Sequence, residues 1–292
     1  MPPAQARELG ALQVAAAAAG GSDPRSEGSR SCTYLVHDLS LAALKVDGER
    51  VDVREALLRL PHGYVCYTPP PWAPDIGPLP ALANGHITFG CFNNLAKVTP
   101  EVLASWSAIL AAIPASRLVL RTHALADAAT RESFATRAAT HGIDPARLSL
   151  LGPAPHAELL DGYNAIDIAL DPFPYAGGLT AIEALFMGAP LVAMAGTSFA
   201  ARHAVSHLNN VGLADWVAQD SAGYIARAIA AAQNIPALAG LRASLRPRVT
   251  ASPLMDAPRF GRALGDALRH AWIKRCETEA SLQGAAQRPS SM

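Results

Sequence analysis

Charged residues are scarce in this sequence, and their signs cancel. Of the 292 residues only 16% are Asp, Glu, Lys or Arg, with 24 basic and 24 acidic side chains, whereas 50% are hydrophobic. A chain of this composition can bury a core, which excludes an intrinsically disordered protein. Because the formal net charge is zero, we expect neither a nucleic acid nor a membrane surface as a partner.

Cysteines are few, and long apolar runs are missing. The four cysteines include no Cys-x-x-Cys pair and lie too far apart for a disulfide framework or a zinc site, so we expect free thiols in a reducing cytoplasm. No stretch approaches the roughly 18 uninterrupted apolar residues of a membrane span. Seven arginines between Arg242 and Arg275 form a local excess of charge, which favours a solvated helical face over an anion-binding or partner surface.

The chain changes character along its length. Residues 1–31 are rich in Ala, Gly and Ser, which predicts a disordered or low-complexity lead. Residues 32–85 hold short apolar runs and the proline-rich stretch "PHGYVCYTPPPWAP", which predicts a connecting segment. We expect residues 86–255 to form one domain, residues 256–277 a C-terminal helix, and residues 278–292 a disordered tail.

Short apolar runs alternate with helical patterns from residue 86 onward. The runs are "HITFGCF", "SRLVLRT", "RLSLLG", "IDIALD", "PLVAM" and "DWVA". Strands this apolar are typical of a sheet covered on both faces, and alternating strands and helices predict a doubly wound parallel sheet, an α/β fold. Such sheets bind ligands beyond the carboxyl ends of their strands. The loops that follow the strands are therefore the candidate site.

The first of these loops is "FNNLAK", residues 92–97. Asn93 and Asn94 offer amide donors and acceptors, and Lys97 offers a cation that can neutralise a phosphate. The alternative is that Lys97 is an ordinary surface residue.

The second loop is "GPAPHAEL", residues 152–159. Its two prolines hold the backbone groups of Ala154 and His156 in place, and a rigid loop can read a flat base through main-chain hydrogen bonds. The alternative is a proline-stiffened turn before a helix.

The third loop leads into "DPFPYAGGLTAIEALFMGAP", residues 171–190. Gly177 and Gly178 permit positive φ and close approach of a ligand, and Thr180 stands at a helix start, where free N–H groups and the helix dipole attract anions. Glu183, one turn later, is a candidate acceptor for two ribose hydroxyls. The alternative is a capping box between Thr180 and Glu183.

Two other patterns carry less weight. His203 and His207 stand four residues apart on a predicted helix, but no neighbouring third ligand accompanies them, so packing is favoured over a metal site. Ser198 and Ser206 lack the context of a nucleophile elbow, which argues against a hydrolase triad.

Four blocks of the sequence resemble a known family. These are "ITFGCFNNLAKVTPEVLASWSAIL", "DIALDPFPYAGGLTAIEALFMGAPLVAMAG", "SFAARHAVSHLNNVGL" and "SPLMDAPRFGRALGDALRHAW". In this order they are similar to the C-terminal catalytic lobe of O-linked N-acetylglucosamine transferases, especially the bacterial SPINDLY-like members, over about residues 58–276. The resemblance implies a Rossmann-like lobe of a GT-B glycosyltransferase.

The resemblance also implies an activity and a pocket. The activity is metal-independent transfer from a nucleotide sugar, UDP-GlcNAc above all and GDP-fucose in some relatives, to Ser or Thr of a protein or peptide acceptor, without a cofactor. Lys97 would stabilise the diphosphate. The nucleotide-binding positions carried over, together with the glycine pair, are Asn94, Lys97, Ala154, Pro155, His156, Leu159, Gly177, Gly178, Leu179, Thr180 and Glu183.

The sequence departs from the family pattern both at single residues and in whole segments. Leu179 and Leu159 replace polar residues of animal members, and Glu183 replaces an aspartate. Tetratricopeptide repeats and a complete N-terminal lobe are not recognisable, and residues 32–85 fit only a remnant of that lobe. His37 and His62 match no motif, so the catalytic base is unassigned. A nucleotide-binding module that is inactive, or that needs an N-terminal-lobe partner, is therefore the main alternative, and a GT-B epimerase is a third.

Overall fold

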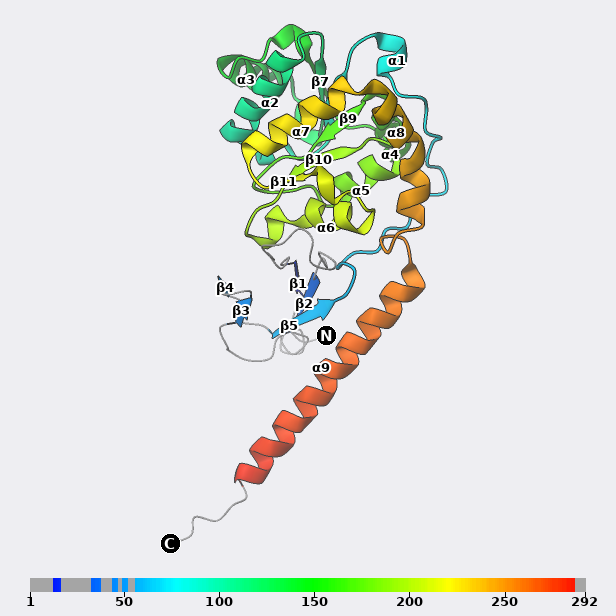
Figure 1. The fold of residues 1–292 in the computed structure, drawn as a ribbon. Coiled ribbons are helices and arrows are strands. Elements are labelled where there is room, and N and C mark those ends of the chain that lie inside the picture. The colour runs from blue at the N-terminus through cyan, green and yellow to red at the C-terminus, as the bar shows by residue number, and fades with distance from the viewer. Residues whose placement is uncertain (1–12, 17–32, 38–43, 47–48, 52–55, 287–292) are drawn as a thin grey trace. The chain divides into compact units, whose positions relative to one another are not determined.

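The computed structural model describes residues 13–16, 33–37, 44–46, 49–51 and 56–286 (Figure 1). The chain folds into two compact units. Residues 67–255 form one, here called the central unit, and residues up to 66 and from 256 onward form the other, the terminal unit.

The central unit is built on a six-stranded sheet in which every neighbouring pair is parallel. The strands lie in the order β11-β10-β9-β6-β7-β8. Strands β6 and β9, in the middle, are fully buried, whereas the edge strand β8 is partly exposed. The strands are β6 (Thr88–Cys91), β7 (Arg117–Arg121), β8 (Leu148–Leu151), β9 (Ile168–Leu170), β10 (Leu191–Met194) and β11 (Val217–Ala218).

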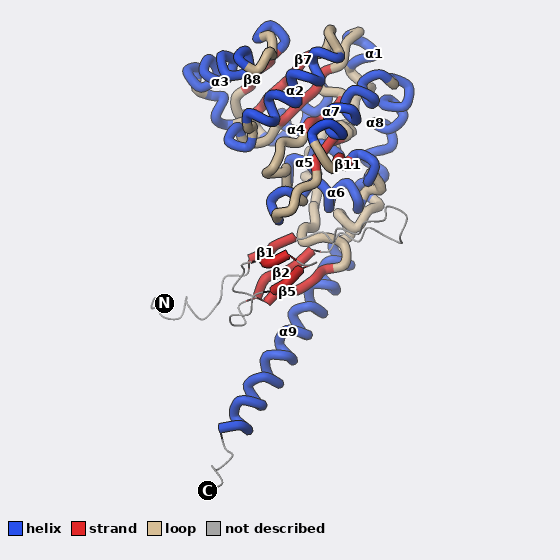
Figure 2. The backbone as a smooth tube through the Cα atoms, turned by 60° about the vertical axis from the view of Figure 1, so that its left-hand side comes forward, coloured by secondary structure: helices blue, strands red, loops and turns tan. Residues whose placement is uncertain are grey.

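Helices flank this sheet on both sides, so the predicted doubly wound sheet is confirmed (Figures 1 and 2). Thr99 caps the first long helix, because its Oγ1 accepts a hydrogen bond from the Val102 amide at 3.3 Å. The helices are α1 (Ala81–Asn84), α2 (Pro100–Ala112), α3 (Ala128–Thr140), α4 (His156–Asp161), α5 (Leu179–Phe186), α6 (His203–Asn210), α7 (Ser221–Gln233) and α8 (Ile235–Thr250).

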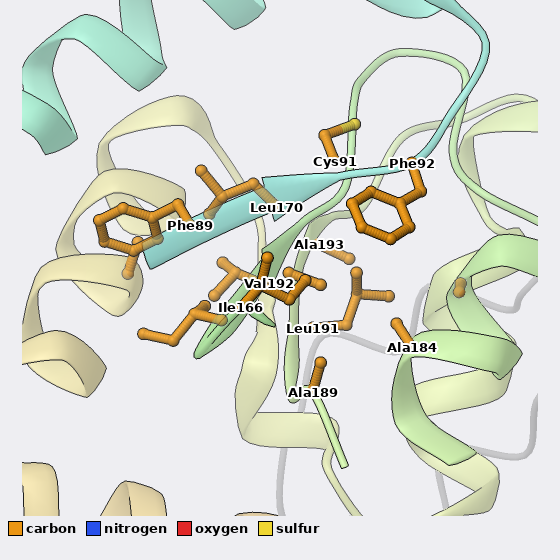
Figure 3. Packing of buried hydrophobic residues seen from close by; sticks show 14 of the residues in the cluster. Phe89, Cys91, Phe92, Ile166, Leu170, Ala184, Ala189, Leu191, Val192 and Ala193 are labelled. Carbon is orange, nitrogen blue, oxygen red and sulfur yellow. The ribbon is translucent and has the colours of Figure 1, made fainter. Parts of the chain in front are cut away.

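The core lies between the central strands and the helices that cover them. Figure 3 shows Phe89 of β6, Leu170 of β9, Val192 of β10 and Ala184 of α5 as members of one buried hydrophobic cluster. Each of these four side chains is at most 3% exposed. Apolar runs of three or four residues are buried here because both faces of the sheet are covered.

The strand order determines where a ligand can bind. Read along the sheet from the other edge, the strands appear in the sequence order 3-2-1-4-5-6, which is that of dinucleotide-binding Rossmann folds. The order reverses between β6 and β9, which are neighbours in the sheet. The loops after these two strands, residues 92–97 and 171–178, therefore flank the crevice at the switch point.

The N-terminal boundary of the central unit differs from the prediction. The unit begins at Tyr67 rather than at residue 86. The Tyr67 amide donates to the Leu254 carbonyl at 2.7 Å, and Leu79 is 1% exposed in the core. The proline-rich stretch thus packs as part of the unit, because proline is compatible with extended packing segments and not with helix interiors.

The terminal unit holds short strands and a long helix. Residues 1–31 were expected to be disordered, but Gln13–Ala16 forms strand β1. This strand pairs antiparallel with β2, and the backbone groups of the two strands hydrogen-bond to each other. The rest of the lead lies outside the described residues, as does the tail from residue 287. The elements are β1 (Gln13–Ala16), β2 (Thr33–His37), β3 (Leu44–Val46), β4 (Glu49–Val51), β5 (Ala56–Leu60) and α9 (Ala257–Ala286).

Helix α9 extends nine residues beyond the predicted end at residue 277, so residues 278–286 are helical rather than a tail. This segment is rich in Ala, Glu, Leu and Gln, which are good helix formers, and Pro289 lies beyond it. None of the described helices is long and apolar enough to cross a membrane.

The arginine-rich segment is not only a solvated face. Arg242 of α8 is 1% exposed, and its guanidinium donates to the carbonyls of Gly77 and Ile166 at 2.9 and 3.0 Å. Arg246 donates to the carbonyls of Phe186 and Pro74 at 3.1 and 2.7 Å. These two arginines join α8 to the end of α5 and to nearby loops of the central unit. They supply hydrogen-bond donors to carbonyl groups there, which need partners when they are buried.

Candidate nucleotide site

The ammonium of Lys97 lies at the switch point between the two loops. Its Nζ donates to the carbonyl of Ala176 at 2.9 Å and to Asn93 Oδ1 at 3.4 Å. The same atom lies 4.0 Å from the centre of the Tyr175 ring, in a cation–π contact. Burial lowers the pKa of Lys97, and the nearby Asp171 raises it. Lys97 is therefore held inside the crevice, which the surface-residue alternative does not expect.

The two neighbouring asparagines have different roles. Asn94 is exposed, and its Oδ1 accepts a hydrogen bond from the Ala96 amide at 2.9 Å, which caps the 3-10 turn Leu95–Lys97. Asn93 is buried, and its Oδ1 accepts from Thr180 Oγ1 at 3.0 Å. The polar residue that joins the two loops in the structure is thus Asn93, one position before the predicted Asn94.

Of the two glycines, Gly177 is explained by packing rather than by a positive φ. Neither glycine is among the positive-φ glycines of the described chain. A Cβ on Gly177 would lie 2.6 Å from Asp171 Oδ1, whereas a Cβ on Gly178 would meet nothing within 4 Å. The Gly177 amide also donates to that carboxylate oxygen at 2.8 Å. Gly177 is required because the loop folds tightly over Asp171.

Helix α5 begins beside Lys97 without a side-chain cap. Gly178 is the N-cap residue, and Leu179, the first helical residue, is 57% exposed. The first N–H groups of a helix have no intrahelical partner and carry the positive end of its dipole. Because Thr180 Oγ1 bonds to Asn93 and not to Glu183, the capping box is excluded. An exposed helix start beside an ammonium group suits an anion.

Glu183 lies one turn further along α5 and is 2% exposed. Its Oε1 lies 2.8 Å from His156 Nε2, which therefore donates to it, and His156 is the first residue of α4. Burial raises the pKa of Glu183, and the hydrogen bond from His156 lowers it. This pair of side chains thus joins the start of α4, which follows the edge strand β8, to the second turn of α5, which follows β9.

The remaining residues of the second loop lie next to His156 in the chain. Pro155 is exposed and serves as the N-cap position of α4, and Ala154 before it is half-buried. Leu159 packs against the hydrophobic core, and its amide bonds to the Pro155 carbonyl at 2.9 Å. The loop is thus anchored by its helix while Pro155 and His156 stay accessible.

Two site residues did not emerge from the sequence. Asp171 is 1% exposed, and burial raises its pKa to about 7, while the Gly177 amide and Lys97 lower it. An acidic residue directly after the apolar strand β9 was the available signal. Tyr175 carries the ring over Lys97, and only its place between β9 and the glycine pair pointed to it.

The two histidines of α6 are buried, as the packing alternative expects. His203 is 7% exposed, and its ring lies 4.5 Å from that of Phe199 between centroids. His207 is 1% exposed, and burial lowers its pKa to about 3. Among the residues that the structure describes, no group of three or more His, Cys, Asp or Glu side chains is arranged to hold a metal ion.

Comparison with known proteins shows the family of this chain. Residues 79–264 match the model of glycosyl transferase family 41. A probable UDP-N-acetylglucosamine–peptide N-acetylglucosaminyltransferase SPINDLY from Oryza sativa subsp. japonica is 43% identical over 228 residues, which cover 77% of this chain and 24% of the rice protein. The chain therefore spans about a quarter of that relative's length. The resemblance carried by the sequence blocks is confirmed.

Solved structures agree with the fold. A mutant of Thermobaculum terrenum O-GlcNAc transferase superposes with a TM-score of 0.71 at 37% identity, covering 76% of this chain and 42% of that one. Sucrose-phosphate synthase from Thermosynechococcus elongatus superposes with a TM-score of 0.51 at 18% identity, covering 72% of this chain and 52% of that one, which shows a likeness of fold alone. The predicted Rossmann-like lobe of GT-B type is confirmed.

Proposed function

The chain belongs to glycosyl transferase family 41, and on that basis we propose that residues 67–255 are the donor-binding lobe of a glycosyltransferase. The donor is UDP-GlcNAc, and the acceptor is a Ser or Thr hydroxyl of a protein or peptide. The similarity to the rice and Thermobaculum proteins supports this choice, because both are described as N-acetylglucosamine transferases. No cofactor or metal ion takes part in the proposed reaction.

The observation that carries the proposal is the position of Lys97 beside the start of α5. When the bond between the anomeric carbon and the diphosphate oxygen breaks, the electron pair remains on the diphosphate. A positive side chain and the free N–H groups of a helix start stabilise such developing charge, since they are held in place before the reaction. The ammonium of Lys97 is held by two hydrogen bonds and the side chain of Thr180 by one, so their positions are set in advance.

The second turn of α5 and the loop before α4 would bind the nucleoside. Glu183 offers a buried carboxylate to the ribose hydroxyls, and its partner His156 lies at the accessible end of the pair. The backbone of Ala154 and Pro155 would lie against the base. Ribose and base would thus meet groups from two loops that the His156–Glu183 hydrogen bond holds together.

The acceptor side of the reaction belongs to another part of the protein. The proposed site uses one sheet, whereas the chain spans 24% of the rice relative and 42% of the bacterial one. We propose that an N-terminal lobe, on the same chain or a partner chain, supplies the acceptor contacts and the base that takes the hydroxyl proton.

Calorimetric titration with UDP and with GDP tests the donor site. Wild type should bind UDP in preference to GDP, and Lys97→Met should bind UDP about ten- to a hundredfold more weakly, because a charge-assisted contact is lost. Glu183→Gln should also weaken binding, whereas Lys274→Met on α9 should not. Binding of neither nucleotide by wild type, or equal binding by Lys97→Met, would contradict the proposal. Binding without sugar transfer in the presence of the other lobe would instead support an inactive nucleotide-binding module.

A further inference from the structure

We propose that Tyr175 is a positioning residue that holds the Lys97 ammonium toward the donor diphosphate, and that it acts through the face of its aromatic ring. The inference rests on the proposed function of the site, because it assigns a further residue to the same step. It concerns a side chain that touches Lys97 and is not itself assigned to the nucleotide.

The contact has the geometry of a cation–π interaction. Lys97 Nζ lies 4.0 Å from the centre of the Tyr175 ring, well within the roughly 6 Å over which such a contact is attractive. An ammonium has three N–H donors, and the hydrogen bonds to Ala176 and Asn93 use two of them. Among the described residues, the third donor has no such bond and is left for a ligand oxygen. The Tyr175 ring, the carbonyl oxygen of Ala176 and Asn93 Oδ1 together fix the position of the Lys97 ammonium.

Burial does not explain why an aromatic residue occupies this position. Tyr175 is 51% exposed, so its ring contributes little to the core. Lys97, in contrast, is half-buried, and burial lowers its pKa. A cation–π contact strengthens as the cation loses water, so the ring stabilises the ammonium where the site removes its hydration. This makes the contact with Lys97 the principal role of the ring.

Tyr175 is itself held in place from the next loop of the sheet. The amide of Ala176 donates to the carbonyl of Ala200 at 2.8 Å, which joins the loop after β9 to the loop after β10. On the side chain, the Tyr175 ring lies 6.2 Å from that of His203 between centroids, and His203 packs edge-on against Phe199. Burial lowers the pKa of His203 to about 4, so this support is uncharged near neutral pH. The Tyr175 ring that contacts Lys97 is therefore itself placed beside a ring of α6, that of His203.

A double-mutant cycle measured by calorimetry with UDP and GDP separates this role from direct contact. Tyr175→Phe keeps the ring and should bind within about twofold of wild type, whereas Tyr175→Leu should bind about three- to tenfold more weakly. In a Lys97→Met background, Tyr175→Leu should have no further effect. Trp72→Leu, which removes another exposed aromatic ring of the central unit, is the matched control and should leave binding unchanged.

The outcomes distinguish this inference from the proposed function. If wild type binds and Lys97→Met does not, but Tyr175→Leu binds as wild type does, the inference is wrong and the donor site stands. An equal loss from Tyr175→Leu with and without Lys97 would also overturn it, because the ring would then act on the nucleotide or on the fold. If wild type binds neither nucleotide, the proposed function itself fails.

A second measurement observes the positioning without any nucleotide. The chain has three lysines, Lys45, Lys97 and Lys274, so the side-chain signal of Lys97 can be assigned by Lys97→Arg in a protein labelled at lysine. Protons above an aromatic face are shielded, so the ε-protons of Lys97 should resonate upfield of the other two lysines. Tyr175→Leu should abolish this shift and Tyr175→Phe should keep it. An unshifted Lys97 signal in a folded wild type would overturn the inference.

Discussion

His156 Nε2 lies 2.8 Å from Glu183 Oε1, and this hydrogen bond joins the start of α4 to the second turn of α5. The two residues differ sharply in exposure, because the Glu183 side chain is 3% exposed and that of His156 is 44% exposed. Within the described part of the chain, the buried carboxylate thus has one side-chain donor, and that donor is partly solvated. This relationship should be visible in how nucleotide binding responds to pH.

We expect His156→Ala to move the pH dependence of nucleotide binding upward. Burial raises the pKa of Glu183 and His156 lowers it, so loss of the donor should raise that pKa further. In the proposed site the ionised carboxylate accepts hydrogen bonds from the ribose hydroxyls. On that proposal, affinity should fall as the pH drops through this pKa, and should do so at a higher pH in the variant. Calorimetric titrations between about pH 5 and about pH 8 measure it. His123→Ala, at an exposed position, should keep the wild-type profile.

Asp171→Asn should change how stability varies with pH. Burial raises the pKa of Asp171 from 3.8 to about 7. The folded protein therefore binds this proton more tightly than the unfolded chain, and the resulting stability is complete below about pH 4 and is lost as the pH rises through about 7. Asparagine does not titrate, so the variant does not lose stability in this way. Its free energy of unfolding relative to wild type should therefore rise between about pH 4 and about pH 7 by on the order of 2–4 kcal/mol. Urea unfolding at several pH values measures the difference, and a parallel profile for the two proteins would contradict it. The exposed Glu132→Gln is the control.

The two neighbouring glycines should respond very differently to alanine. Gly177→Ala places a Cβ 2.6 Å from Asp171 Oδ1, so the loop must shift, and we expect the free energy of unfolding to fall by about 1–3 kcal/mol. Gly178→Ala meets nothing within 4 Å and should cost less than about 1 kcal/mol. Thermal unfolding of both variants checks this. Equal melting temperatures would show that the close approach of Gly177 to Asp171 is not maintained in solution.

Arg242→Met should destabilise the central unit strongly. Methionine keeps much of the volume but leaves the carbonyls of Gly77 and Ile166 without their donor, and each buried unsatisfied group costs about 1–3 kcal/mol. We expect a loss of at least about 3 kcal/mol in urea unfolding. Arg248→Met, on the same helix, loses one exposed bond to the Gly212 carbonyl and should change stability by less than about 1 kcal/mol. Similar losses in both variants would contradict a special role for Arg242.

Much of the fold follows from local patterns. The six strands of the parallel sheet coincide with apolar runs that the sequence displays openly, and the cap at Thr99 is encoded by residues three positions apart. Strand and helix periods repeat every two and 3.6 residues, so they can be recognised within a short window. The length of α9 and the strand β1 were missed, because weakly apolar segments such as Gln13–Ala16 become strands through pairing with another segment.

The sequence by itself pointed to the loops after β6 and β9 as part of the candidate site, because the order of strands and helices places the ends of these strands at one edge of the sheet. Only the tertiary structure decided which side chains meet there. Lys97 and Ala176 are 79 residues apart, and Asn93 and Thr180 are 87 apart. A pattern of burial shows which residues face inward but not which partner each one contacts, and that is why Asp171 and Tyr175 were recognised only from the packing of the structure.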